Sequence, residues 1–334
     1  YNITLTPSSD STTTDSFSIK LWAQTSKAYE QRTTTVEAQF LNIEVIYEKA
    51  NLTVEYDDSK GDVKDGSTKV AANSTIEILK AGKTLTATPD SGVTNAHFVA
   101  WTGPAEQKTV GDATINVYKF LNGNGSYQVV PTAETMTIRA AFSTGEPWFY
   151  VNNKQYLVQG LNEAVQYVST ITDKTIILAN NATLPAGTYK IPSGVTLLIP
   201  YDVNGTLCTT QPTVSTGSTK ATAFRTLTMA SGAEIIVQGG GALSVSGIHT
   251  ATMPYNGSPI NSVGVINMKD GSSITVESKG NLYAWGYIYN QTKDSDGAMV
   301  TIKSGGTVYE DFQLRDWRGG TFTNTMNGGL LSNG

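Results

Sequence analysis

An alternating run of aromatic residues near the end of the chain is the pattern best suited to contact a ligand. The run consists of Tyr283, Trp285, Tyr287 and Tyr289. In one extended strand these four side chains would share a face, at intervals of ~7 Å. Rings spaced in this way can stack on the C–H faces of successive sugars, so the run is a candidate ligand-binding surface. The alternative is that the rings pack against each other or under a neighbouring loop. The residues between them are small or aliphatic, which favours an inward-facing opposite side: Ala284, Gly286 and Ile288.

The densest cluster of charged residues follows directly, over Glu310–Arg318. Its candidate catalytic residues are Asp311, Arg315, Asp316 and Arg318. Carboxylates can hold calcium against an acidic sugar while a basic residue removes a proton, which is the chemistry of a polysaccharide lyase. Charges of alternating sign on a surface more often pair with each other. The cluster therefore leaves an enzyme as the alternative to a non-catalytic role.

The remaining residues that could do chemistry are few. His97 and His249 are far apart and lack partners at metal-ligand spacing, so neither a zinc site nor a catalytic triad is expected, and His97 is predicted to be structural. Cys208 is the single cysteine, so no internal disulfide can form. Fragments of a calcium loop occur at Asp57–Asp62 and Asp294–Gly297, but turn formation explains both more simply. No cofactor is expected, and calcium is the one metal left open.

A four-residue phrase that ends in glycine recurs in the second half of the chain. It occurs as Ile191-Pro-Ser-Gly194, Met229-Ala-Ser-Gly232, Met268-Lys-Asp-Gly271 and Ile302-Lys-Ser-Gly305, with the glycines 38, 39 and 34 residues apart. Fifteen of the sixteen positions three and five residues before and after these glycines are apolar or tyrosine, and Glu310 is the exception. This pattern predicts a strand on each side of a tight glycine corner. Repetition at this interval indicates a solenoid, in which each unit buries its apolar face against its neighbours.

Polar insertions interrupt the predicted solenoid. They lie at Val203–Thr222, Ile248–Ser262 and Tyr287–Ser295. Insertions at the same place in each repeat project from one side, which is often the binding side. Before the first repeat, apolar residues at helical spacing predict a short amphipathic helix over 160–169, and a strand is predicted at Thr175–Leu178. The helix is expected to cap the open end of the solenoid.

The first 143 residues also favour β-structure. Strand-like runs occur at Asn2–Thr6, Phe17–Ala23 and Thr33–Tyr47, which we interpret as a segment of a β-sandwich. Six further strands are predicted in a compact β-domain: Leu52–Tyr56, Thr75–Leu79, Lys83–Thr88, His97–Trp101, Ile115–Phe120 and Thr135–Phe142. Tight turns are predicted at Asp57–Asp62 and Asn122–Gly125.

Three segments of this β-domain carry a resemblance to a known family. Leu85-Thr-Ala-Thr-Pro-Asp-Ser-Gly92, Phe98-Val-Ala-Trp101 and Met136-Thr-Ile-Arg-Ala-Ala-Phe142 together resemble the internalin B-repeat modules of bacterial surface proteins. The resemblance covers about ninety residues, and the middle section Thr102–Gly125 is longer than in a minimal repeat. It implies a spacer or adhesive module within a larger surface protein.

The helix, the strand and the glycine-cornered repeats carry a second resemblance. Over about 149–334 the chain is similar in architecture to right-handed parallel β-helix proteins of the pectin-lyase-like group. This resemblance implies the fold alone, because the phrase of paired aspartates followed by Gly-His-Gly that marks β-helix pectinases has no counterpart here.

Composition narrows the class of protein. The net charge is −5, from 28 acidic and 23 basic residues, and this argues against a nucleic-acid-binding face. No apolar run approaches the ~20 residues that a membrane-spanning helix needs, so no membrane insertion of this segment is expected. The chain begins at Tyr1 without a leader, and we interpret it as a mature or excised segment.

The sequence therefore predicts an all-β protein in which a small β-domain precedes a right-handed parallel β-helix with a short capping helix. The predicted divisions are 1–50, 51–144 and 145–334. The favoured function is a non-catalytic, secreted or cell-surface segment of a bacterial protein that binds glycans or host surface proteins. The alternatives are a polysaccharide lyase or glycoside hydrolase, and a stalk or surface-layer element that associates with itself.

Overall fold

The computed structural model describes residues 49–203, 206–208, 223–245, 262–284, 286–290, 299–310, 315–316, 323–326 and 330–332. The predicted strands at 1–50 lie almost wholly outside these residues. Strands dominate the described part, which contains a single α-helix, so the all-β class is confirmed. That helix is too short to cross a membrane, and no other described segment is a candidate spanning helix.

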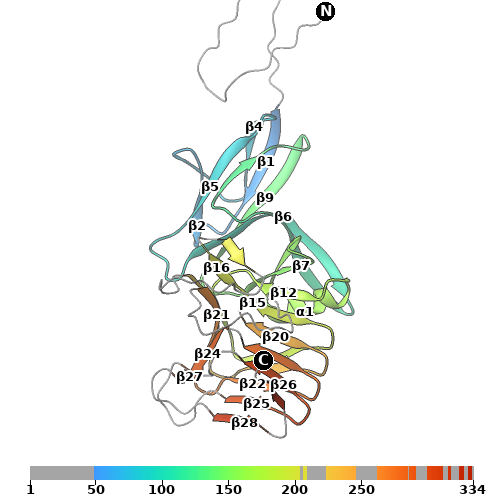
Figure 1. Cartoon of the computed structure of the whole chain (residues 1–334). Coiled ribbons are helices and arrows are strands. Elements are labelled where there is room, and N and C mark those ends of the chain that lie inside the picture. The colour runs from blue at the N-terminus through green and yellow to red at the C-terminus, as the bar shows by residue number, and fades with distance from the viewer. Residues whose placement is uncertain are drawn as a thin grey trace, which may run out of the picture.

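The N-terminal module, residues 49–143, consists of two sheets packed face to face (Figure 1). One sheet contains β1 (Lys49–Glu55), β4 (Ser74–Leu79), β6 (His97–Val110) and β9 (Thr135–Ser143). The other contains β2 (Gly61–Asp65), β3 (Thr68–Val70), β5 (Lys83–Pro89) and β8 (Ser126–Val129). Their facing side chains form a closed core around the fully buried Trp101.

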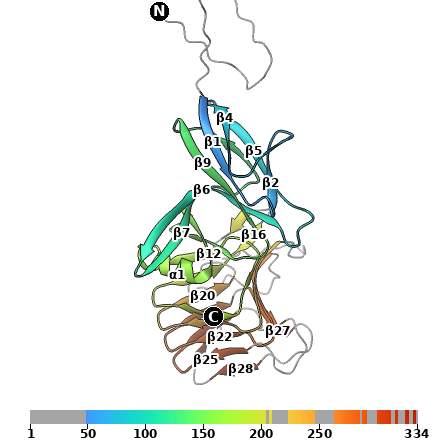
Figure 2. The same cartoon turned by 180° about the vertical axis from the view of Figure 1, so that it is seen from behind.

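All six strands predicted for this module are present, and one of them is much longer than predicted. β6 continues past Trp101 to Val110 and forms a long hairpin with β7 (Ala113–Asn122). This hairpin accounts for most of the long middle section Thr102–Gly125. Its strands leave the module and extend toward the second half of the molecule (Figures 1 and 2). β2, β3 and β8 were not predicted, because each is short and rich in polar residues.

The second half of the chain, from 175 onward, passes repeatedly through three parallel sheets, and we call this part the three-sheet stack. Sheet 1 contains β12 (Thr175–Leu178), β15 (Thr196–Ile199), β20 (Ala242–Val245), β23 (Asn281–Ala284), β26 (Thr307–Glu310) and β29 (Leu330–Ser332). Sheet 2 contains β13 (Ala182–Leu184), β18 (Ala223–Met229), β21 (Ser262–Met268), β24 (Tyr287–Asn290) and β27 (Arg315–Asp316). Sheet 3 contains β14 (Gly187–Ile191), β19 (Ala233–Val237), β22 (Ser273–Val276), β25 (Met299–Ile302) and β28 (Thr323–Met326). A small antiparallel hairpin, β16 (Tyr201–Val203) and β17 (Thr206–Cys208), stands between β15 and β18.

The side-chain pattern predicted around the four glycines is confirmed. All fifteen apolar positions are buried in the interior of the three-sheet stack. The four glycines have left-handed backbone angles, with φ between 74° and 80°. A residue with a Cβ is strained in this conformation, which explains why glycine recurs there.

The grouping of those four glycines into one repeat was wrong. Gly232 and Gly271 lie at the corner between sheets 2 and 3, where the Gly232 N–H donates to the Gly271 carbonyl at 3.1 Å. Gly194 and Gly305 lie at the corner between sheets 3 and 1. There a ladder of backbone hydrogen bonds links Gly194 to Gly240, Gly240 to Lys279 and Lys279 to Gly305, at 2.8, 2.8 and 2.7 Å. Each pass of the chain therefore has two corners with the same local chemistry.

The true repeat shortens along the stack. The aligned residues in sheet 3 are Ile191, Val237, Val276, Ile302 and Met326, which lie 46, 39, 26 and 24 residues apart. The first two insertions both occur between sheet 1 and sheet 2, as predicted for a common site. The predicted position of the third insertion, Tyr287–Ser295, was wrong. Tyr287–Asn290 is strand β24, and residues 291–298 lie between β24 of sheet 2 and β25 of sheet 3. The corner from β23 to β24 takes only two residues.

One sheet runs without a break from the N-terminal module to the end of the stack. It has thirteen described strands, in the order β29-β26-β23-β20-β15-β12-β10-β11-β7-β6-β9-β1-β4. The joining strands are β10 (Trp148–Val151) and β11 (Tyr156–Gln159), which link β12 to β7. The predicted boundary near residue 144 therefore falls inside a hydrogen-bonded sheet. The division into separate domains stays a prediction.

The predicted helix is present as α1 (Leu161–Ser169) and packs on the first pass of the stack. Its buried residues include Leu161, Ala164 and Val168, as the helical spacing predicted. The helix does not act alone: Ile115 and Val117 of β7 join the same core. In both views the helix and the β6–β7 hairpin lie together beside the first strands of the stack (Figures 1 and 2). The cap is thus built from both halves of the chain.

Candidate functional site

The aromatic run does not form one strand. Tyr283 belongs to β23 in sheet 1, whereas Tyr287 and Tyr289 belong to β24 in sheet 2. Trp285, at the corner between them, lies outside the described residues, as do the side chains of Tyr287 and Tyr289. The intervening residues Ala284, Gly286 and Ile288 are buried, as predicted. Ligand contact by the run stays a prediction, but its rings would be divided between two sheets.

The register of the sheets adds two neighbours that the sequence pattern did not identify. Tyr283 is the Cα partner of Tyr309 on β26, the next strand of sheet 1. Tyr289 is the Cα partner of Arg315 on β27. Tyr283 therefore has an aromatic neighbour on the adjacent strand, and Tyr289 has a basic one. In the sequence, only the 26-residue interval from Tyr283 to Tyr309 indicates that the two tyrosines are neighbours. The other passes of the stack have different lengths, so this interval cannot be recognised as one pass.

The charged cluster and the calcium fragments fall largely outside the described part. Asp311 and Arg318 are outside it, and of Arg315 and Asp316 only the backbone of β27 is described. His249 and the Asp294–Gly297 fragment are outside as well. At the other calcium fragment, Asp57 accepts hydrogen bonds from Ser59, which is the predicted turn chemistry. Asp62 lies in β2 and pairs with Lys69 of β3 at 2.5 Å. No group of three metal-ligating side chains occurs among the residues that the structure describes.

His97 is structural, as predicted, and its contacts specify its protonation state. Its Nε2 atom lies 2.9 Å from Nδ2 of Asn180, and its Nδ1 atom lies 2.8 Å from the carbonyl oxygen of Asn95. Asn180 Oδ1 accepts the backbone N–H of Trp148 at 2.9 Å, so its Nδ2 must donate to the imidazole. His97 is therefore neutral and carries its proton on Nδ1. Burial lowers the pKa of His97 below its ordinary value of 6.5, in agreement with this geometry.

Glu146 fixes the chain at the start of β10. Its Oε1 atom pairs with Lys60 of the N-terminal module at 2.7 Å, and its Oε2 atom accepts the Thr144 N–H at 2.7 Å. Partial burial would raise the pKa of this carboxyl, but the hydrogen bonds from Lys60 and the Thr144 backbone outweigh it. They lower the pKa of Glu146 to about 2. The carboxylate is therefore charged, and paired with Lys60 and the Thr144 N–H, at any pH well above 2.

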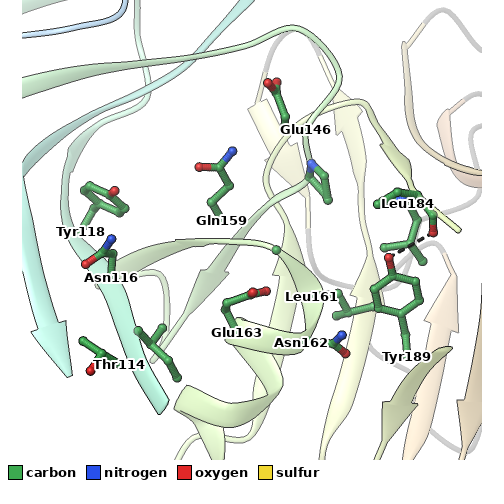
Figure 3. Close-up of a pocket in the computed structure, with 14 residues that line it drawn as sticks. Thr114, Asn116, Tyr118, Glu146, Gln159, Leu161, Asn162, Glu163, Leu184 and Tyr189 are labelled. Atoms are coloured by element: carbon green, nitrogen blue, oxygen red, sulfur yellow. Dashed lines mark hydrogen bonds between the residues drawn. The ribbon is translucent and has the colours of Figure 1, made fainter. Parts of the chain in front are cut away.

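A cleft of ≈ 590 Å³ opens between the hairpin and the first pass of the stack. Thr114, Asn116 and Tyr118 of β7 lie on one side of it and Tyr189 of β14 on the other (Figure 3). Gln159 and Glu163, from the end of β11 and the first turn of α1, lie between them (Figure 3). Four segments contribute to the lining: 114–118, 146–147, 159–163 and 184–189.

No known family, curated protein or solved structure matches this chain. The cleft and the aromatic residues are therefore interpreted from their own chemistry. The volume of the cleft is within the range of small-molecule sites, about 300–1,000 Å³. Its lining combines buried apolar side chains with exposed amides and carboxylates.

Proposed function

We propose that this chain is a non-catalytic segment of a secreted or cell-surface bacterial protein, which holds ligand-contacting residues on a rigid support for adhesion to glycans or host surface proteins. The observation that carries the proposal is the thirteen-stranded sheet that joins the N-terminal module to the three-sheet stack. A flexible linker would let the two parts reorient freely. A continuous hydrogen-bonded sheet with a shared core keeps them at a fixed distance and angle instead.

In this proposal the three-sheet stack is a right-handed parallel β-helix of the pectin-lyase-like type. Three parallel ladders, an interior filled by aligned apolar rows and glycine corners support it. Such a stack suits display, because each pass is held by its neighbours while loops and outward side chains can vary. The N-terminal module corresponds to the internalin B-repeat type, with the Phe98 and Trp101 rings 5.9 Å apart in or beside its core.

Ligand contact is assigned to the aromatic residues around the β23–β24 corner. Tyr283 and Tyr309 are adjacent in sheet 1, and Tyr287 and Tyr289 follow in sheet 2 with Trp285 between the two groups. Aromatic rings distributed around a corner suit a saccharide chain that wraps the edge of the stack. This differs from the flat strip that the sequence pattern suggested.

The experiment is a glycan array and a host-cell surface binding assay with the full chain and two variants. Trp285→Ala removes the central ring, and Met299→Ala removes an exposed apolar side chain from β25 in sheet 3 as the matched control. The proposal predicts binding that Trp285→Ala loses and Met299→Ala retains. Absence of binding by the wild-type chain to any glycan or cell surface would contradict the adhesive function. Equal binding by both variants would exclude the aromatic run.

A further inference from the structure

The cleft between the β6–β7 hairpin and the first pass of the stack has the composition of a binding site. The residues beneath it are apolar: Leu161, Leu184 and Pro147 are buried, and the rings of Tyr118 and Tyr189 keep a small exposed part at its base. Its rim is polar and exposed, formed by Thr114, Asn116, Gln159, Asn162 and Glu163. An apolar base with a few convergent polar groups is the usual arrangement of a small-molecule site.

The polar groups of the rim are available to a ligand. The described hydrogen bonds and ion pairs engage Glu146 with Lys60 and the Tyr189 hydroxyl with the Pro185 carbonyl, at 2.7 and 3.0 Å. None of the described hydrogen bonds or ion pairs involves the side chains of Asn116, Gln159 or Asn162. Amides offer both donors and acceptors. Three amides around one cleft match a ligand whose groups both donate and accept hydrogen bonds, such as a sugar ring with several hydroxyl groups.

The charge of the cleft restricts the ligand further. The lining contains two carboxylates, those of Glu146 and Glu163, and no lysine or arginine. The Glu146 charge is offset by Lys60, which leaves Glu163 as the net charge of the rim. Glu163 of α1 and Tyr189 of β14 line the same cleft (Figure 3). Burial raises the pKa of Tyr189, and the Glu163 carboxylate adds to the rise. An anionic ligand would be repelled.

The glycine before the helix allows Glu163 to reach this position. Gly160 has a φ of 93°, and a Cβ added to it would lie 2.1 Å from Oε2 of Glu163. The carboxylate thus lies over the glycine at the N-terminus of α1, where the helix dipole stabilises a negative charge. A side chain at position 160 would displace it.

We propose that this cleft binds a saccharide unit that carries no negative charge, in neutral or amino-sugar form. The amides of Asn116, Gln159 and Asn162 hydrogen-bond the ring hydroxyls, and Glu163 accepts from a hydroxyl or an ammonium group. The site is separate from the aromatic run and does not depend on it. It lies between the cap, which is formed by the hairpin and α1, and β14 in the first pass of the stack.

The test measures binding of four probes to the full chain by saturation-transfer NMR and calorimetry: methyl glucoside, glucosamine, glucuronate and N-acetyl-lysine amide. We expect millimolar binding of the first two, with glucosamine tighter, and no binding of glucuronate. Gln159→Ala and Asn162→Ala are expected to weaken both sugars by about tenfold. Glu163→Gln is expected to remove the preference for glucosamine. All three residues are exposed, so the variants should fold.

Two controls make the outcome decisive. Gln166→Ala changes an exposed residue of the same helix outside the cleft and should bind both sugars like the wild type. Trp285→Ala should also keep these affinities, which separates the cleft from the proposed adhesive surface. The proposal is overturned if neither sugar binds, if the rim variants bind them unchanged, or if N-acetyl-lysine amide binds as tightly as the sugars.

Discussion

Asn180 donates a hydrogen bond from Nδ2 to Nε2 of His97 at 2.9 Å, although the two residues lie 83 positions apart. His97 begins β6 of the N-terminal module, and Asn180 follows β12 in the first pass of the three-sheet stack. Asn180 also donates to the Glu146 carbonyl at 3.0 Å and accepts the Trp148 N–H. A buried amide therefore ties the module, the connecting segment and the stack together.

This contact predicts that stability falls as the pH drops below 6.5. Burial lowers the pKa of His97 most, and the nearby Arg225 also opposes protonation, whereas the Asn95 carbonyl and Glu146 favour it. Protonated His97 would also present an N–H toward the amide donor of Asn180. Because the pKa is lowered in the folded state, the unfolded chain binds the proton first, and stability is lost from about 6.5 downward. Thermal unfolding between pH 8 and 5 should show this loss, and His97→Gln should flatten the profile. An identical profile in wild type and variant would contradict the assignment.

Lys60 controls the acid titration of Glu146. Lys60→Met removes the strongest interaction that lowers the pKa of this carboxyl, so the pKa should rise from about 2 toward or above its ordinary value of 4.5. The stability that the lowered pKa of Glu146 provides is present above pH 4.5 and is lost as the pH falls toward 2. The variant, whose folded-state pKa would lie near or above 4.5, should lack this contribution, so its stability should change less between about pH 5 and 2. Carboxyl NMR titration of both proteins measures the shift. An unchanged pKa in Lys60→Met would show that the pair does not form in solution.

The ladder of corner residues predicts opposite effects for two substitutions. Lys279 occupies the left-handed conformation, with a φ of 63°, in a column otherwise made of glycine. Lys279→Gly should stabilise the protein by about 0.5–1 kcal/mol, because relief of backbone strain exceeds the entropy that glycine loses. Gly240→Ala should destabilise it by about 1–2 kcal/mol, since the new Cβ would lie 2.5 Å from Oγ of Ser193 at a φ of 82°. Denaturant unfolding measures both, and effects of the same sign would contradict the ladder.

These corners also show how far the sequence could predict the fold. Alternation of apolar residues around each glycine correctly located the buried strands, because a period of two specifies which side chains face inward. It could not separate the two corners of each pass, since both combine a strand, a left-handed glycine and another strand. The distinction depends on which residues align between passes, and passes of unequal length conceal that alignment.

The candidate sites were predicted less well, for related reasons. The period of two from Tyr283 to Tyr289 suggested one strand, because a two-residue corner preserves the alternation of inward and outward positions. The cleft carried no local signal, since its lining comes from four segments between residues 114 and 189. The length of the section Thr102–Gly125 in the N-terminal module was the one visible sign of the hairpin that forms a wall of the cleft.

The shared cap predicts that a substitution in the hairpin destabilises the stack. Ile115 of β7 is 2% exposed and belongs to the core of the three-sheet stack. Ile115→Ala should destabilise the protein by about 2–5 kcal/mol and should reduce hydrogen-exchange protection in α1 and β12. The matched control is Ile138→Ala, which removes the same side chain from the core of the N-terminal module. If only Ile138→Ala reduced protection in α1 and β12, the shared core would be wrong.

The distance between β4, at one end of the thirteen-stranded sheet, and β26, near its other end, tests the rigid connection most directly. Spin labels at Ala71→Cys, beside β4, and Ser304→Cys, beside β26, can be placed in a Cys208→Ser background and measured by pulsed electron spin resonance. Both labelled positions are exposed. A continuous sheet predicts one narrow distance distribution. A broad or two-component distribution would show a hinge near residue 145 and would contradict a rigid connection between the N-terminal module and the three-sheet stack.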